Sequence, residues 1–146
     1  MSDTSDLSTS PARTTKSVLF IDGHDIDRHY YAQRLKAACP DLLIYEAASG
    51  KTGLELYYAN LIDCVVLELG LPDMSGFEVL AKLVPVARAP EVPVIVLTKL
   101  TSLALLQVAR LNGAQAILQK DTASGDDLEK AVLKAMATVQ RDPKKE

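Results

Sequence analysis

The segment Cys64–Gly76, which reads CVVLELGLPDMSG, holds the pattern that decides the fold. Its first residues are apolar without polar alternation, which is typical of a short strand covered on both faces of a parallel sheet. Ser75 then stands where a helix can begin, and that helix is expected to extend to about Leu83. The segment therefore predicts a buried strand over residues 64–69 followed by a loop and a helix.

The same unit of strand and helix repeats on both sides of this segment. Residues 17–22 (SVLFID) form an apolar run before a helix that Asp25 can cap and that Cys39-Pro40 ends. The other predicted strands cover residues 42–47, 94–97 and 116–118, and the other helices begin at about residue 49 and span residues 102–111 and 125–140. A long loop carries Pro85, Pro90 and Pro93. Five strand-helix pairs with right-handed crossovers predict an α/β fold, a five-stranded parallel doubly wound sheet with five helices.

Length and composition indicate one globular domain. The 146 residues are 48% hydrophobic and 24% charged, with a net charge of −3, so we expect no direct nucleic-acid binding. Polar residues 1–16 and 141–146 are predicted to be disordered tails around a domain over residues 17–140. No apolar run reaches the ~18 residues of a membrane span. The two cysteines, Cys39 and Cys64, are not spaced as metal ligands, and the sequence shows no secretory signal. We therefore expect a soluble, cytoplasmic protein without membrane contact.

Four polar residues stand at or directly after the ends of four different predicted strands. They are two carboxylates, a hydroxyl and an ammonium: Asp22, Glu68, Thr98 and Lys120. In an open doubly wound sheet, the site lies beyond the carboxyl ends of the strands, where the strand order switches. We therefore expect these four side chains to converge on one site.

With these residues in place, the chain resembles the response-regulator receiver family over roughly residues 17–140. Residues 66–76 (VLELGLPDMSG) are similar to the phosphoacceptor segment of that family, and Thr98 is similar to its switch hydroxyl. Gly113 followed by Lys120 is similar to its lysine signature. The resemblance implies the flavodoxin-like receiver fold and a role in two-component signalling.

Three positions depart from the family where its chemistry takes place. Glu68 stands at the position of the phosphorylated aspartate, and its extra methylene misplaces the carboxylate by about 1 Å. Gly23 stands where the family usually has a second acidic residue, which leaves Asp22, Glu68 and the Gly70 carbonyl as metal ligands. We therefore expect weak or absent Mg²⁺ binding and no cofactor. Ile117 replaces an aromatic residue whose rotation reports phosphorylation in the family.

These departures leave several interpretations open. Glu68 mimics the activated state by reaching Lys120 and Thr98 as a phosphoryl oxygen would, or the charges form a cluster that only neutralises itself. We prefer a phosphorylation-independent interaction module that is not an enzyme, and the alternative is a response regulator phosphorylated by a histidine kinase. A nucleotide-binding protein built on residues 50–52 (GKT) is disfavoured, because Tyr45 stands where the phosphate-loop pattern requires glycine.

The predicted helix over residues 102–111 is apolar nearly all round, which predicts an exposed apolar patch. We assign Leu103, Leu106 and Leu111 to this patch, as an interface with a protein partner or a second copy of the chain. The resemblance adds the following strand and the last helix to the interface, because the family commonly uses them for dimerisation or effector contact. The alternative is a helix covered by the tails of the chain.

Overall fold

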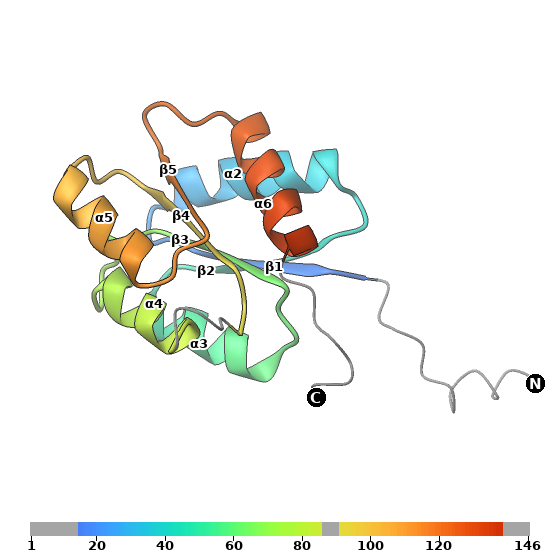
Figure 1. Ribbon diagram of the computed structural model, residues 1–146. Coiled ribbons are helices and arrows are strands. Elements are labelled where there is room, and N and C mark those ends of the chain that lie inside the picture. Colours follow the sequence, from blue (N-terminus) through green and yellow to red (C-terminus); the bar gives the residue numbers. More distant parts are fainter. Residues whose placement is uncertain (1–14, 86–90, 139–146) are drawn as a thin grey trace, which may run out of the picture.

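The computed structural model describes residues 15–85 and 91–138, in which strands and helices alternate (Figure 1). The strands are β1 (Ser17–Ile21), β2 (Leu43–Ala47), β3 (Cys64–Leu67), β4 (Val94–Thr98) and β5 (Ala116–Gln119). The helices are α2 (Asp25–Ala38), α3 (Gly50–Ala59), α4 (Gly76–Leu83), α5 (Leu103–Leu111) and α6 (Gly125–Thr138). Every predicted element is present, and its bounds differ by no more than one or two residues.

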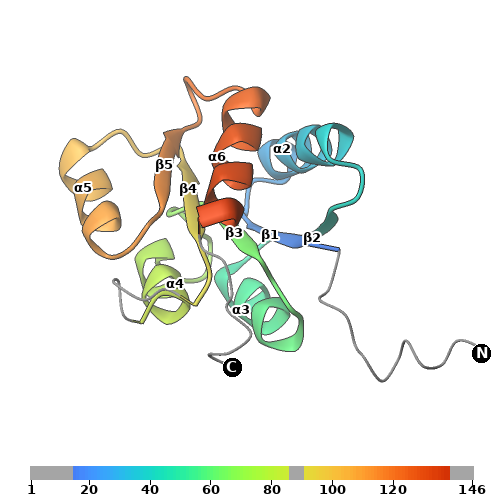
Figure 2. The same ribbon diagram turned by 45° about the vertical axis from the view of Figure 1, so that its right-hand side comes forward.

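All five strands run parallel in one sheet with the order β2-β1-β3-β4-β5. Helices α2 and α6 lie together on one face, and α3, α4 and α5 cover the other (Figure 2). The strand order reverses between β1 and β3. In such sheets the binding site lies outside the carboxyl ends of the strands at this point. The predicted fold, a five-stranded parallel doubly wound sheet with five helices, is confirmed.

The central strands are buried on both faces, which explains their continuous apolar runs. Leu19 and Val65 pack into one core layer, whereas Phe20 and Val66 pack into the other. Each fully buried side chain of this kind stabilises the fold by roughly 1.5–3 kcal/mol. Because neither face of the central strands β1, β3 and β4 is left to water, their polar residues lie only at their ends, and that places Asp22, Glu68 and Thr98 at the sheet edge.

The helices above the carboxyl edge begin at side-chain caps. Ser75 caps α4 in a capping box with Glu78, so the chain turns sharply after β3. The expectation that Asp25 caps α2 was wrong. The N-cap is His24, whose Nδ1 accepts a 3.2 Å hydrogen bond from the amide N–H of Asp27.

Several predictions concern residues outside those that the structure describes. The loop with the three prolines includes residues 86–90, which lie outside the described residues. So do most of the predicted tail 1–16 and all of 141–146. Across 15–85 and 91–138, no helix has the length and apolar character that crossing a bilayer demands.

Candidate functional site

The four polar residues at the strand ends meet at the carboxyl edge of the sheet. Asp22 follows β1, Glu68 follows β3, Thr98 ends β4 and Lys120 follows β5. The Nζ atom of Lys120 lies 2.6 Å from Asp22 Oδ2 and 3.1 Å from Glu68 Oε1. The Thr98 hydroxyl donates a hydrogen bond to Glu68 Oε2. Parallel strands thus bring together residues that are far apart in the sequence.

These charges are buried and depend on one another. The side chains of Lys120 and Glu68 are each 6% exposed and that of Asp22 is 9% exposed. Burial alone would lower the pKa of Lys120, but the hydrogen bond and charge of Asp22, with those of its other carboxylate neighbours, outweigh it and raise that pKa. Lys120 therefore stays protonated at neutral pH, and it compensates carboxylates that have lost most of their contact with water.

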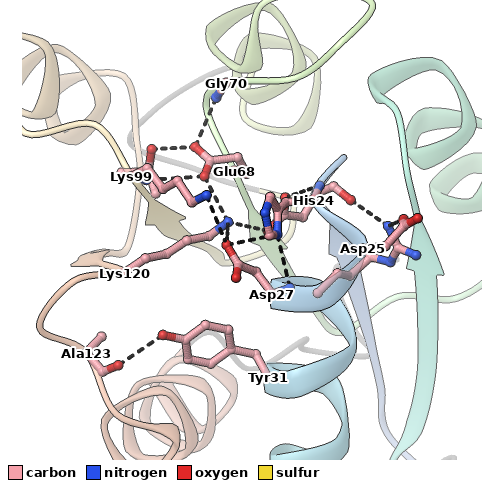
Figure 3. Close-up of polar contacts among 12 residues, drawn as sticks. His24, Asp25, Asp27, Tyr31, Glu68, Gly70, Lys99, Lys120 and Ala123 are labelled. Carbon is pink, nitrogen blue, oxygen red and sulfur yellow. Dashed lines mark hydrogen bonds and ion pairs between the residues drawn. The ribbon is translucent and has the colours of Figure 1, made fainter.

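The Glu68 carboxylate accepts hydrogen bonds from several donors at once (Figure 3). Oε2 accepts from the Thr98 hydroxyl and, at 3.0 Å, from the amide N–H of Gly70. Oε1 accepts from the amide N–H of Lys99 at 3.2 Å and lies 3.1 Å from the Lys120 ammonium. Gly70, whose carbonyl was named above as a remaining ligand of a weak or absent metal site, contacts the cluster through its amide. A hydroxyl, two amides and an ammonium together form a cradle for negatively charged oxygens.

Asp27 belongs to the same cluster, although the sequence analysis did not identify it. It lies in the first turn of α2, and its Oδ2 is 3.0 Å from Lys120 Nζ, 3.6 Å from Lys99 Nζ and 3.3 Å from His24 Nδ1. Burial would raise the pKa of Asp27, but the hydrogen bond and charge of Lys120, with the charge of Lys99, outweigh it and lower that pKa. The available signal was an acidic residue in the helix turn directly after β1.

Arg28 is a second residue that the sequence analysis missed. Its buried guanidinium donates to the Asp22 carbonyl oxygen at 2.7 Å and pairs with Glu46 at 2.9 Å and with Asp25 at 2.8 Å. Burial would lower the pKa of Arg28, but the hydrogen bonds with Glu46 and Asp25 outweigh it and raise that pKa. Arg28 therefore ties the end of β1 to α2 and β2, and this fixes the backbone that presents Asp22.

The start of α3, considered above as a phosphate loop, is occupied by a carboxylate of the chain itself. The amides of Gly50 and Lys51 donate to the two Asp73 oxygens at 2.8 and 2.9 Å. These bonds lower the pKa of Asp73. Because Asp73 already takes the amides that a phosphate group would need, the geometry does not favour a nucleotide site here.

Helix α5 presents an apolar face to solvent, but not with all the predicted residues. Leu103 and Leu111 are exposed, at 80% and 69%. The prediction for Leu106 was wrong, because this side chain is only 9% exposed and packs inward. The exposed face is instead completed by two other residues, Leu105 and Val108. We call these four side chains, 103, 105, 108 and 111, the α5 apolar face.

A hollow of about 420 Å³ lies next to this face, between α5, β5 and the start of α6. Half-buried Ile117 lines it, together with Leu103, Leu106 and Arg110. Ile117 is the position at which the resemblance implies an aromatic residue. The smaller side chain therefore stands beside open space on the surface that the sequence analysis selected as an interface.

Known proteins with similar sequences include a histidine kinase and a transcriptional activator. The chain is 29% identical over 115 residues to "Histidine kinase P4" of Formosa agariphila and 31% identical over 120 residues to "Transcriptional activator protein ExaE" of Pseudomonas putida. These alignments cover 79% and 82% of this chain, but only 8% and 55% of those two curated relatives. The chain thus spans a small part of the first relative and about half of the second.

Solved structures show the same fold. A CheY-like response regulator receiver domain protein of Methanospirillum hungatei superposes with a TM-score of 0.77 at 21% identity, over 86% of this chain and 97% of that one. The receiver domain of the putative response regulator NarL of Mycobacterium tuberculosis gives a TM-score of 0.74 at 25% identity, over 86% and 98%. The sequence model of the response regulator receiver domain family matches residues 18–133. This chain therefore belongs to the response regulator receiver domain family and is a receiver domain of two-component signalling.

Proposed function

We propose that this receiver domain signals by protein-protein contact without being phosphorylated, and that Glu68 holds it in one state. The observation that carries the proposal is the set of donors around the Glu68 carboxylate: the Thr98 hydroxyl, the amides of Gly70 and Lys99 and the Lys120 ammonium. Donors of these kinds stabilise the oxygens of phosphoryl groups. Glu68 thus supplies permanently the negative oxygens that phosphorylation would supply transiently.

The same contacts oppose phosphoryl transfer to Glu68. Both of its carboxylate oxygens are hydrogen-bonded, and its side chain is buried. To attack a phosphodonor, one oxygen would have to leave its donors and align with the phosphorus, which an error of about 1 Å already makes costly. The domain is therefore proposed to be a signalling module and not a phosphoryl-transfer catalyst.

The first prediction concerns the mass of the protein after treatment with acetyl phosphate and Mg²⁺. We expect the intact mass of the wild type to remain unchanged, because no oxygen of Glu68 is free to attack. A phosphorylatable receiver domain under the same conditions serves as the positive control for the donor. A gain of one phosphoryl group in the wild type that is absent from Glu68→Gln would show that Glu68 is the acceptor and would overturn the proposal.

We further propose that the α5 apolar face binds a second copy of this chain. Its four side chains are aliphatic and exposed, and the hollow beside Ile117 adds a depression into which such side chains fit. Burying two or three of them would contribute roughly 1.5–3 kcal/mol each before the costs of association, which suits a weak dimer. A different protein partner is the competing outcome of the test.

The second prediction is that L103E/L111E weakens self-association without loss of folding. Exposed positions tolerate polar residues within about 0.5 kcal/mol, whereas charges at an apolar contact oppose its burial. Sedimentation velocity over a concentration series measures the association, and circular dichroism monitors the fold. L106E is the matched control on the same helix and is expected to unfold, because Leu106 packs inward. A double variant that associates like the wild type would remove this face from the interface, and a monomeric wild type would leave the face to another protein.

A further inference from the structure

Two lysines converge on the acidic groups at the carboxyl edge of the sheet. Lys120 Nζ lies 2.6, 3.0 and 3.1 Å from oxygens of Asp22, Asp27 and Glu68. Lys99 Nζ approaches the same Asp27 oxygen at 3.6 Å from the end of the neighbouring strand β4 (Figure 3). Three carboxylates therefore face two ammonium groups, which together carry the charge of one divalent cation.

A receiver fold implies a divalent cation at this edge, and the residues present do not fit one. Mg²⁺ requires a nearly octahedral shell of oxygen ligands, which usually includes one or two carboxylates of the protein. Here Asp22 Oδ1 accepts the amide N–H of His24 at 2.9 Å, and Asp22 Oδ2 contacts Lys120 at 2.6 Å. Both Glu68 oxygens also accept hydrogen bonds from donors of the chain. The oxygens that would bind a metal ion are thus directed at N–H and O–H groups.

The position of the missing acidic residue offers no easy replacement. A Cβ atom on Gly23 would lie 2.8 Å from Pro72 Cδ and 3.2 Å from the Ala48 carbonyl oxygen. An acidic side chain there would require the proline ring to move. The edge has therefore lost both the charge of a second acid at position 23 and the space for it.

We propose that the ammonium groups of Lys99 and Lys120 take the place of a divalent cation, and that Lys99 adds a repulsion at Asp27 to the donors that already occupy Asp22 and Glu68. Lys120 belongs to the lysine signature of the family, whereas Lys99 lies outside the motifs that match. The backbone and side chain of Lys99 act on different partners: its amide donates to Glu68 at 3.2 Å, and its ammonium reaches Asp27. Lys99 thus links the end of β4 to α2, as a metal ion bound by residues of both elements would.

Electrostatics explains why Lys99 matters more than its exposure suggests. Its side chain is 59% exposed, but its ammonium lies 3.6 Å from Asp27 Oδ2, so a cation bound to that oxygen would be repelled by it at short range. At about 4 Å, even with the dielectric of water, repulsion between a divalent ion and one ammonium weakens binding roughly thirty-fold. Removing Lys99 leaves three carboxylates with Lys120 as their remaining lysine partner.

The third prediction tests this with Mg²⁺ and Mn²⁺ titrated separately, followed by thermal unfolding and calorimetry. We expect a cation-dependent rise in Tm that is larger in K99A than in the wild type, with binding roughly thirty-fold tighter, because the other donors stay in place and the repulsion from one ammonium is removed. K99R keeps the charge and is expected to behave like the wild type. K82A removes one positive charge from the exposed last turn of α4 and controls for net charge.

Three results would overturn the inference: K99A that titrates like the wild type, a wild type that itself binds Mg²⁺ with a clear one-site isotherm at millimolar concentration, or an equal gain in K82A. The inference goes beyond the proposed function, because it concerns charge balance and not the readout of the signal. The two can fail separately, since the cation titrations contain no phosphodonor and the mass measurement does not report cation affinity.

Discussion

Replacing Lys120 by methionine is expected to destabilise the domain by about 3–5 kcal/mol. Methionine keeps an unbranched side chain of similar length but leaves Asp22 and Glu68 buried without the ammonium that lies 2.6 and 3.1 Å from them. Removing one partner of a buried ion pair costs more than the pair contributes, because an uncompensated charge remains. Urea unfolding followed by circular dichroism at neutral pH measures the loss.

The pH dependence of K120M gives a sharper test of the cause. The lowered pKa of Asp27 stabilises the wild type above the unfolded-state pKa of about 3.9, and this contribution is lost as the pH falls through the folded-state pKa. The raised pKa of Lys120 stabilises the fold below about pH 10.4 and stops doing so only as the pH rises through the folded-state value. K120M lacks this compensation, so we expect its deficit relative to the wild type to shrink as acid protonates the carboxylates.

K82M is the matched control for K120M, because Lys82 lies on the exposed face of α4. It is expected to change the unfolding free energy by less than about 0.5 kcal/mol. An equal loss in both variants, or a K120M deficit that does not change with pH, would show that the buried ion pairs do not carry the stability of this edge.

Gly76→Ala is expected to cost about 3 kcal/mol, because a Cβ atom has no space there. It would contact Leu69 Cα, and it would lie 2.7 Å from the Leu69 carbonyl oxygen and 2.8 Å from that of Glu68. All three atoms belong to the backbone, so no side chain can move aside. The amide of Gly76 also donates to the Leu69 carbonyl oxygen at 2.9 Å, which closes the loop between β3 and α4. Methyl insertion therefore forces apart the loop that presents Glu68.

Gly70→Ala is the control in the same loop. Its Cβ atom would come no closer than 3.9 Å to any other group, with Glu68 Oε2 as the nearest atom. We expect a change of less than about 0.5 kcal/mol, measured as the midpoint of thermal or urea unfolding. Similar losses in the two variants would mean that the loop adapts to a side chain at either position and that Gly76 has no special role.

The fold and the centre of the site were predictable because both follow from backbone regularity. Apolar runs without alternation indicate parallel strands buried on both faces, and parallel strands place their carboxyl ends on one edge. Asp22, Glu68, Thr98 and Lys120 were identified by that argument alone. It needs no knowledge of side-chain direction.

The remaining features depend on side-chain direction, which the sequence pattern does not contain. Asp27 lies on a helix, and Lys99 follows a strand that already contributes Thr98, so neither was singled out as a charge partner. The position of Leu106 was predicted wrongly because the helix is apolar nearly all round. Without a polar face, the sequence does not indicate which side of the helix is buried. Packing decides that rotation, with Leu106 and Ala109 as the buried residues of α5.

The ion pairs at the sheet edge also have a consequence for the order of events in folding. Lys120 is 98 residues from Asp22 and 93 residues from Asp27 along the chain, so these bonds close only after β1 and β5 have joined the same sheet. Contacts that close large loops form late, and stabilisation that is absent from the transition state slows unfolding with little effect on folding. In stopped-flow measurements, the deficit of K120M should therefore lie mainly in a faster unfolding rate. A folding rate slowed to the same degree would instead place this cluster in the folding nucleus. The charge cluster therefore forms late in folding and breaks early in unfolding, and its main kinetic effect is to slow unfolding.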